Sequence, residues 1–148
     1  MKVLSVNAGS STLKFRLYEM PEENVLAKGA FERIGLENGN YSIKMNGEKI
    51  EKSLDMKDHS DAVSLDEIGA VGHRVVHGGS KYARSVIIDE EVMKEIESIS
   101  DLAPLHNPAN LVGIRAFMSA IPSAIQVACF DTAFHQTMPE KNYLYPVP

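Results

Sequence analysis

The sequence has 148 residues, of which 44% are hydrophobic, so it can bury one core and is predicted to form a single domain over residues 1–148. Its 20 acidic and 15 basic residues give a net charge of −5 without a Lys or Arg block, which argues against a nucleic-acid partner. No apolar run is long enough to span a membrane, and no basic segment followed by an apolar stretch suggests a secretory signal. The single cysteine, Cys129, excludes a disulfide framework and favours a reducing compartment. We therefore predict a soluble, cytoplasmic protein with mixed α/β structure.

The first half of the sequence is typical of strands. Residues 2–6 form an apolar run, residues 7–12 a polar turn, and residues 13–18 alternate apolar and polar side chains with the period of a half-buried strand. Residues 24–34 are predicted to pair antiparallel with that second strand. Residues 41–54 form two alternating runs around Asn46-Gly47, which predicts a type I′ hairpin at a sheet edge.

The second half is predicted to contain a short helix at 57–63, a strand at 68–79, two helices and a final buried strand at 124–130. Asp89 is expected to cap the first of the two helices, through residue 99, and Asn107 to cap the second, with Pro108 at its first position and Pro122 after its end. The buried side of this second helix is predicted to consist of Leu111, Ile114, Met118 and Ile121. The predicted fold class is therefore a mixed β-sheet flanked by helices, with an appended hairpin.

The turn at residues 7–12 is rich in small donors. It holds a carboxamide, a glycine and three hydroxyls, and it matches neither the Walker P-loop nor the dinucleotide fingerprint. Its composition fits a polar hairpin loop as well as a phosphate cradle. Lys14 shares a strand face with Thr12 and can reach back toward an anion in the turn, which favours the cradle. Asn7, at the end of the first strand, is suited to orient a hydrated metal ion through its carboxamide oxygen.

The predicted strand at 68–79 places Arg74 and Val76 on one face, and His73 and His77 on the other. The two histidines lie four residues apart, but zinc is improbable because that motif requires a helix and a glutamate. An Arg beside a Val suits a short carboxylic acid, since the guanidinium binds the carboxylate bidentately and the Val packs against the alkyl tail. The alternative is an Arg that covers the strand with a salt bridge.

Three further polar positions have two interpretations each. His106 could donate to a bound anion or be a loop histidine, and Asn107 is better explained as a helix cap than as a ligand. Asp131 ends a strand, where open α/β sheets usually bind ligands, although an Asp there can also cap a short helix. Ser10, His77 and Asp131 could be combined into a hydrolase triad, but no nucleophile elbow supports that hypothesis.

Four segments together resemble the N-terminal half of the acetate kinases: VNAGSSTLKF, VGHRVVHGG, LAPLHNPANL and CFDTAFHQTMP, in this order. The resemblance extends from Met1 to Pro148. It implies a ribonuclease-H-like domain of the acetate and sugar kinase, heat-shock ATPase and actin superfamily. Such enzymes transfer the γ-phosphoryl group of ATP to acetate with Mg²⁺, giving acetyl phosphate and ADP, and they place the nucleotide between two domains.

The resemblance also implies roles for individual residues. It places Asn7 near Mg²⁺, and Ser10, Thr12 and Lys14 at the nucleotide phosphates. The acetate site would consist of Arg74 for the carboxylate, with Val76 and Leu105 around the methyl group. The residues at the reacting groups would be His106, in contact with the phosphoryl group or substrate, and Asp131, to which the family assigns acid/base chemistry. Because a carboxylate acceptor is already ionised near neutral pH, we expect Asp131 to position Mg²⁺ or Arg74 instead.

The sequence departs from the family pattern in two ways. By this resemblance, we expect the second, nucleotide-binding domain to lie outside this sequence, and the predicted helix at 57–63 to be abbreviated relative to the family. A truncated domain that binds without catalysis is therefore one alternative to an acetate kinase. A propionate or butyrate kinase is another, because one or two methylenes change discrimination only modestly in an apolar pocket. The full-length protein is expected to form a homodimer through the other domain.

Overall fold

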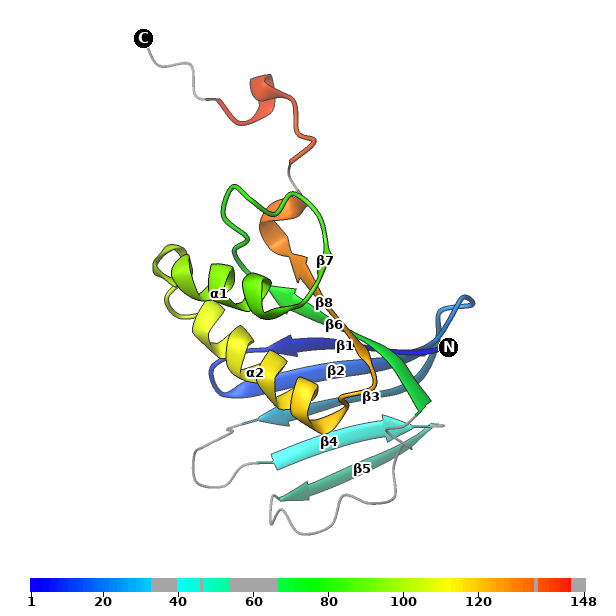
Figure 1. Cartoon of the computed structure of the whole chain (residues 1–148). Coiled ribbons are helices and arrows are strands. Elements are labelled where there is room, and N and C mark those ends of the chain that lie inside the picture. The colour runs from blue at the N-terminus through cyan, green and yellow to red at the C-terminus, as the bar shows by residue number, and fades with distance from the viewer. Residues whose placement is uncertain (33–39, 46, 54–66, 135, 145–148) are drawn as a thin grey trace.

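The computed structural model describes residues 1–32, 40–45, 47–53, 67–134 and 136–144 (Figure 1). Its strands are β1 (Lys2–Ala8), β2 (Thr12–Glu19), β3 (Asn24–Glu32), β4 (Asn40–Met45), β5 (Glu48–Ser53), β6 (Ile68–Val75), β7 (Val86–Ile87) and β8 (Ile125–Phe130). Its α-helices are α1 (Glu90–Ser98) and α2 (Asn107–Ala120), and short 3₁₀ turns occur at Ser100–Leu102, Asp131–Ala133 and Glu140–Asn142. The predicted helix at 57–63 lies outside the described residues, as do the last two residues of the strand predicted at 24–34. No helix within the described residues is long and apolar enough to cross a membrane.

All the described strands belong to one sheet in the order β5-β4-β3-β2-β1-β6-β8-β7. Strands β1 to β5 form an antiparallel meander, whereas β1, β6 and β8 run parallel and β7 pairs antiparallel with β8. The structure thus confirms the predicted mixed sheet. It also confirms the appended hairpin, since β5 is the sheet edge and Met45 pairs with Glu48 across a two-residue loop. Gly47 has a φ of 87°, as the second central residue of a type I′ turn requires, but Asn46 lies outside the described residues.

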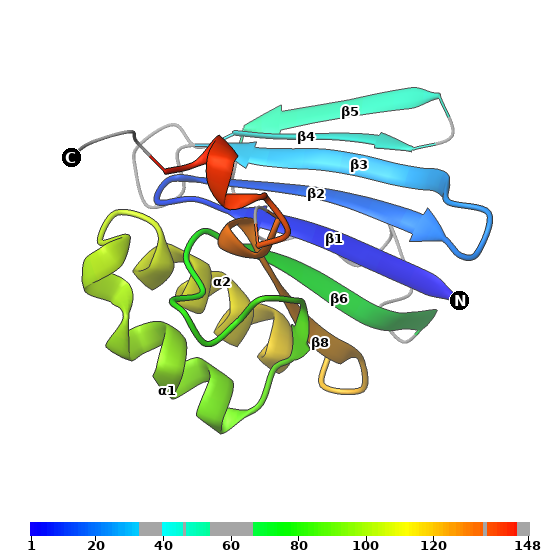
Figure 2. The same ribbon diagram turned by 90° about the horizontal axis from the view of Figure 1, so that it is seen from above.

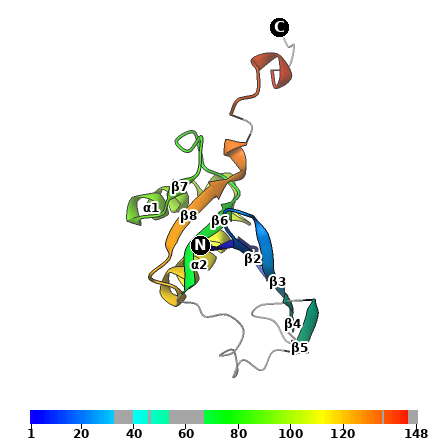
Figure 3. The same ribbon diagram turned by 90° about the vertical axis from the view of Figure 1, so that its right-hand side faces the viewer.

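The two α-helices lie side by side against one face of the β1, β6 and β8 region (Figure 2). Figure 3 shows β4 and β5 at the end of the sheet away from α1. Alternate residues of β1 and β8 are therefore buried and exposed: Leu4 and Val6 are buried but Ser5 is exposed, and Phe130 is buried but Cys129 is exposed. The buried strand predicted at 124–130 is present as β8, but only one of its faces is buried, because within the described residues helices cover only one face of the sheet.

Helix α1 begins as its sequence predicts. Asp89 has an extended backbone, and its carboxylate accepts a hydrogen bond from the Val92 amide at 2.8 Å. Glu90 and Glu91 add negative charge to the first turn, where the helix dipole favours it. The helix then buries Val92 and Ile96 in a core shared with α2 and β8.

Helix α2 buries a stripe that differs from the predicted one at one position. Leu111, Ile114 and Ile121 are buried, but Met118 is 37% exposed and its neighbour Phe117 faces inward instead. The ring of Phe117 packs edge-on against His73 of β6, with 5.7 Å between centroids. The spacing of apolar residues is compatible with either Phe117 or Met118 facing the sheet. Phe117 is the one that does so, and it contacts the His73 ring.

Helix α2 approaches the sheet very closely at Gly113. A Cβ atom at this position would lie 2.6 Å from the Cβ of Ala8 on β1, which is far inside van der Waals contact. Gly113→Ala should therefore destabilise the chain by about 1–3 kcal/mol from overpacking, which exceeds the gain of about 1 kcal/mol in helix propensity. Urea unfolding will measure the change. Ser119→Ala, at an exposed position of the same helix, is the control and should leave the free energy of unfolding within about 0.5 kcal/mol of the starting value.

His73 is a buried polar residue of β6, with 2% of its surface exposed. Its Nε2–H donates to Oε1 of Gln126 on β8 at 2.8 Å, and the Gln126 amide donates in turn to the Ile121 and Ala124 carbonyls. Burial lowers the pKa of His73 below its usual value, because the charged imidazolium loses hydration. The residue is thus a neutral core histidine and is not part of the predicted polar site.

This burial makes the stability of the chain depend on pH. The unfolded chain takes up a proton at His73 at a higher pH than the folded chain does, so the free energy of unfolding should fall as pH drops below about 6.5. Urea unfolding at pH 7.5 and pH 5.5 will measure the drop. His73→Gln should make it smaller, whereas the exposed control His106→Gln should preserve it. An unchanged drop in His73→Gln would contradict this assignment.

Candidate functional site

Three of the predicted site residues come from the carboxyl ends of three neighbouring parallel strands. Asn7 lies near the end of β1, Arg74 near the end of β6, and Asp131 directly after β8. The turn that joins β1 to β2 leaves the sheet at the same edge. Since β1, β6 and β8 run in one direction, this edge is where an open α/β sheet usually holds its ligand.

The β1–β2 turn is compact and polar. The Gly9 amide donates to the Thr12 carbonyl at 2.7 Å, which closes the turn. Ser10 and Thr12 are exposed. Lys14 is also exposed and lies directly across from Asn7 in the β1–β2 register, so its ammonium and the Asn7 carboxamide share one side of the sheet. The turn thus presents hydroxyls and a cation to solvent, as a phosphate-binding loop does.

Arg74 and Asp131 form a bidentate ion pair. The Arg74 Nε lies 3.0 Å from both Asp131 carboxylate oxygens, and its Nη2 lies 2.7 Å from Oδ2. These hydrogen bonds raise the pKa of Arg74 above its usual value, so the guanidinium stays charged. Both side chains remain partly exposed, at 50% for Arg74 and 39% for Asp131. The pair therefore fixes the plane of the guanidinium while it leaves part of Arg74 open to a ligand.

Asn7 is the third member of this cluster. Its Oδ1 accepts from the Nη1 of Arg74 at 3.4 Å, near the limit for a hydrogen bond. Asn7 and Asp131 together offer carboxamide and carboxylate oxygens, the donors that Mg²⁺ prefers. Among the residues that the structure describes, no group of three or more His, Cys, Asp or Glu side chains could hold a metal ion. A cation here would therefore take most of its ligands from phosphate oxygens and water.

Strand β6 ends at Val75, so the predicted strand through residue 79 was too long. The Val76 amide donates to Oδ1 of Asn110 at 3.2 Å and the His77 amide donates to Oδ1 of Asn107 at 3.1 Å, both on α2. These amides leave the sheet because α2 supplies their acceptors. Arg74 is exposed and Val75 buried, as expected, but the strand alternation that grouped Val76 with Arg74 does not continue past Val75.

Asn107 was predicted to cap α2, and this was wrong. The structure places His106 at the cap position without a side-chain cap, and Asn107 is fully buried as the first helical residue. Its Oδ1 accepts from the His77 amide, and its Nδ2 donates to the His77 carbonyl at 3.0 Å. Asn107 therefore anchors the segment after β6 through both polar groups of one residue.

Asn110, which the sequence did not single out, forms a second anchor. It is 4% exposed, and besides accepting from Val76 it donates from Nδ2 to the Ala8 carbonyl at 2.7 Å. Because Ala8 precedes the β1–β2 turn, Asn110 ties that turn to the segment after β6. Two asparagines three residues apart on the apolar stripe of a helix were the available signal, since amides buried there need partners.

The remaining predicted residues have a less direct connection to the Arg74–Asp131 pair. Leu105 and His106 are exposed just before Asn107, and within the described residues no side-chain hydrogen bond joins them to Arg74 or Asp131. The hydrolase triad is not assembled: His77 accepts at Nδ1 from the Gly79 amide, while the carboxylate of Asp131 pairs with Arg74. Thr132 also contributes, since its hydroxyl accepts from the Gly78 amide at 3.0 Å and links the segments that follow β6 and β8.

Comparison with known proteins places this geometry in context. The family model described as "Acetokinase family" matches residues 2–148. An acetate kinase of Bacillus mycoides (strain KBAB4) is 56% identical over 161 residues, an alignment that covers 99% of this chain and 41% of the relative. Because 161 aligned positions exceed the 148 residues of the chain, the relative has at least 13 residues here without a counterpart.

Solved structures agree with the sequence comparison. The crystal structure of Porphyromonas gingivalis acetate kinase matches with a TM-score of 0.87 and 46% identity. That of a propionate kinase from Francisella tularensis subsp. tularensis SCHU S4 matches with a TM-score of 0.85 and 39% identity. Each match covers 99% of this chain and 41% of the solved chain, so the sequence spans about two fifths of these relatives' length. The predicted actin-like ATPase fold is confirmed.

Proposed function

Because this chain belongs to the acetokinase family, we propose that it forms part of an acetate kinase, which reversibly transfers the γ-phosphoryl group of ATP to acetate. The products are acetyl phosphate and ADP. The chain spans about two fifths of its relatives, so the proposal concerns the complete protein, including the predicted second domain and a homodimer formed through it.

The observation that carries this proposal is the convergence of Asn7, Arg74 and Asp131 beside the β1–β2 turn. The cluster joins a guanidinium suited to a carboxylate with a turn suited to phosphate. An acceptor carboxylate and a phosphoryl donor must meet in line at short distance for transfer to occur. The corner at the ends of β1, β6 and β8 supplies a site for each of them.

Arg74 is proposed to bind the acetate carboxylate. Asp131 occupies Nε and Nη2, so a substrate would approach the remaining N–H groups on Nη1 and Nη2. Val76, two residues further on, and Leu105, which is 78% exposed beside Asn107, would line the methyl pocket. Their role rests on the family resemblance, and the Asn107 and Asn110 anchors hold the two segments together.

The geometry favours a positioning role for Asp131. Its three close contacts to Arg74 orient the guanidinium, whereas acetate is already ionised above about pH 5 and needs no base. His106, exposed at the start of α2, would donate to the transferring phosphoryl group, whose charge must be stabilised during transfer.

The phosphate site would use the turn and one cation. Ser10 and Thr12 offer hydroxyls, and Lys14 can neutralise charge on the β- or γ-phosphate. The oxygens of Asn7 and Asp131 fit a Mg²⁺ ion held mainly by phosphates and water. Such an ion would neutralise charge on the phosphates. This chain's contribution would be to orient it through Asn7 and to hold the acceptor at Arg74.

An assay of the complete protein tests the proposal. ATP, acetate and Mg²⁺ with hydroxylamine should yield acetyl hydroxamate, because hydroxylamine traps acetyl phosphate. Omission of acetate or ATP should abolish the product. A folded, full-length protein that forms no hydroxamate would refute the assignment.

A propionate kinase is a second candidate, since the structure of one matches at a TM-score of 0.85. One additional methylene changes discrimination by only about 1–3 kcal/mol in an apolar pocket, so acetate, propionate and butyrate should be compared as competitors. The ratios of kcat/KM among the three acids will decide between these kinases.

The 148-residue chain alone is proposed to bind substrate weakly without catalysing transfer, because the predicted second domain would supply the nucleotide contacts. The same hydroxamate assay on this chain tests that proposal. Measurable turnover by the chain alone would contradict it.

A further inference from the structure

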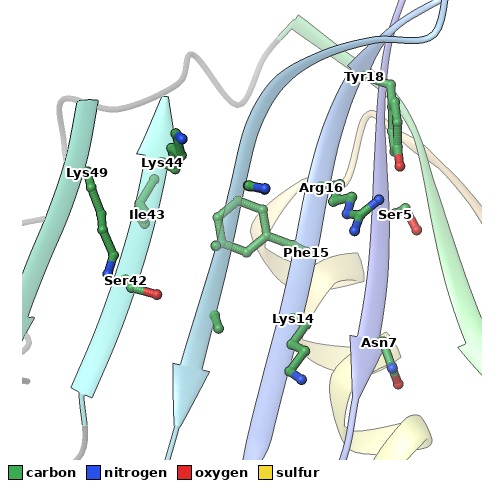
Figure 4. Close-up of a pocket in the computed structure, with 13 residues that line it drawn as sticks. Ser5, Asn7, Lys14, Phe15, Arg16, Tyr18, Ser42, Ile43, Lys44 and Lys49 are labelled. Carbon is green, nitrogen blue, oxygen red and sulfur yellow. The ribbon is translucent and has the colours of Figure 1, made fainter. Parts of the chain in front are cut away.

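The face of β1 to β5 that points away from the helices carries a shallow cationic trough of about 540 Å³. Five of its lining residues are basic: Lys14, Arg16, Lys28, Lys44 and Lys49. In Figure 4 the labelled basic side chains stand in front of the strands while the helices lie behind them. The lining residues include no Asp or Glu. The trough is therefore a positive surface on a chain whose net charge is −5.

The strand register brings four of these cations into one row. Arg16 pairs with Lys28, Lys28 with Lys44, and Lys44 with Lys49 across β2 to β5. Side chains directly opposite in neighbouring strands lie close together, so like charges there destabilise a sheet. This row of positive charges destabilises the sheet, and it occurs on a chain whose net charge is negative. Both facts favour a role for the row in binding an anionic ligand.

Most of these cations have no ion-pair partner among the described residues. Within the part of the chain that the structure describes, Arg16, Lys28 and Lys44 make no ion pair, and Lys49 alone pairs with a carboxylate, that of Glu51. By contrast, the ammonium of Lys81, which is not among the trough residues, lies 3.0 Å from a carboxylate oxygen of Glu91 and 3.3 Å from one of Glu95. The trough thus keeps its charge available to a ligand.

The floor of the trough allows close approach. Four small residues, Ser5, Gly29, Ala30 and Ser42, also line the trough, and the two serines add hydroxyl donors. The row crosses four strands at about 4.8 Å per strand, so its cations form a line about 15 Å long. A matching ligand is a linear anion with closely spaced charges.

We propose that this trough binds a linear condensed phosphate, such as tripolyphosphate or a longer inorganic polyphosphate. Single-stranded nucleic acid fits less well, because it binds on exposed aromatic rings. Of the two rings that line the trough, Phe15 packs against Phe31 and leaves only Tyr18. The inference does not rest on the proposed kinase activity, since Lys28, Lys44 and Lys49 lie outside that site.

Calorimetric titration of the 148-residue chain with tripolyphosphate and with polyphosphate tests the proposal. Lys28→Gln, Lys44→Gln and Lys49→Gln, combined, should raise the Kd about tenfold or more, since each exposed charge contact contributes modestly. The corresponding Lys→Arg combination keeps the charge and should retain binding. A matched control removes three exposed cations elsewhere, by Arg84→Gln, Lys94→Gln and Lys141→Gln, and should leave the Kd within about twofold. Circular dichroism confirms that each variant is folded.

Three results would overturn the proposal. The first is the absence of binding to either phosphate chain. The second is an equal loss of affinity in the trough and control variants, or no loss in either, which would show that the trough is not the site. The third is that poly-glutamate of matched charge binds as tightly as polyphosphate and loses as much affinity in the trough variant. That result would identify an acidic protein segment as the ligand. Each result is separable from the kinase assay, which uses none of these probes.

Discussion

Arg74→Ala in the complete protein should raise the KM for acetate by about 10- to 100-fold while it changes kcat much less. A charge-assisted, bidentate contact to a carboxylate contributes about 1.5–3 kcal/mol, which corresponds to that range of affinity. Because the proposed contact would be made to bound acetate as well as during transfer, its loss should appear in the KM. Hydroxamate formation measured against acetate concentration gives both constants.

Two further variants sharpen this test. Arg74→Lys keeps the charge but loses the planar fork, so its KM should lie between those of the native protein and Arg74→Ala. Arg115→Ala removes an exposed guanidinium on α2, whose Nη2 lies 3.5 Å from Glu97, and should leave both constants unchanged. A large fall in kcat with an unaltered KM would instead place Arg74 at the transferring phosphoryl group.

The sequence was informative wherever local rules decide the structure. The alternation at residues 13–18 predicted the two faces of β2, and Asp89 predicted the start of α1. Asp131 and Arg74 were each predicted as site residues from their own strands. The family resemblance also led to the expectation that Asp131 positions Arg74 or Mg²⁺. Their bidentate geometry could not be predicted, because it joins residues 57 positions apart and depends on the β6–β8 register.

The errors at Asn107 and at the end of β6 share one physical cause, which is a distant partner that competes with a local rule. Asn107 followed by Pro108 fits a helix cap, but the His77 backbone, 30 residues away, takes both polar groups of the side chain. The same contact and its neighbour at Asn110 end β6 at Val75, earlier than its apolar run suggests. Strand β7 was missed because two residues are too few to show a period.

Asn107→Ala should therefore have the largest effect on stability, a loss of about 2–4 kcal/mol in the free energy of unfolding. The substitution removes two hydrogen bonds from a fully buried side chain and leaves the amide and carbonyl of His77 without these partners. Urea unfolding of the 148-residue chain measures the change. Asn142→Ala, at an exposed position, is the control and should change the free energy by less than about 0.5 kcal/mol.

The same variant links this anchor to the site. Asn107 holds His77, which follows Val76, and Asn110 holds both Val76 and Ala8, the residue before the β1–β2 turn. If the Asn107 and Asn110 side chains position the residues that bind acetate, Asn107→Ala in the complete protein should raise the KM for acetate. The KM should be measured at temperatures well below the unfolding transition. Asn107→Asp keeps the shape and the acceptor for the His77 amide, but it replaces the Nδ2 donor with an oxygen that faces the His77 carbonyl. Its KM and stability should thus be impaired as well, whereas native kinetics in both variants would restrict Asn107 to a role in folding.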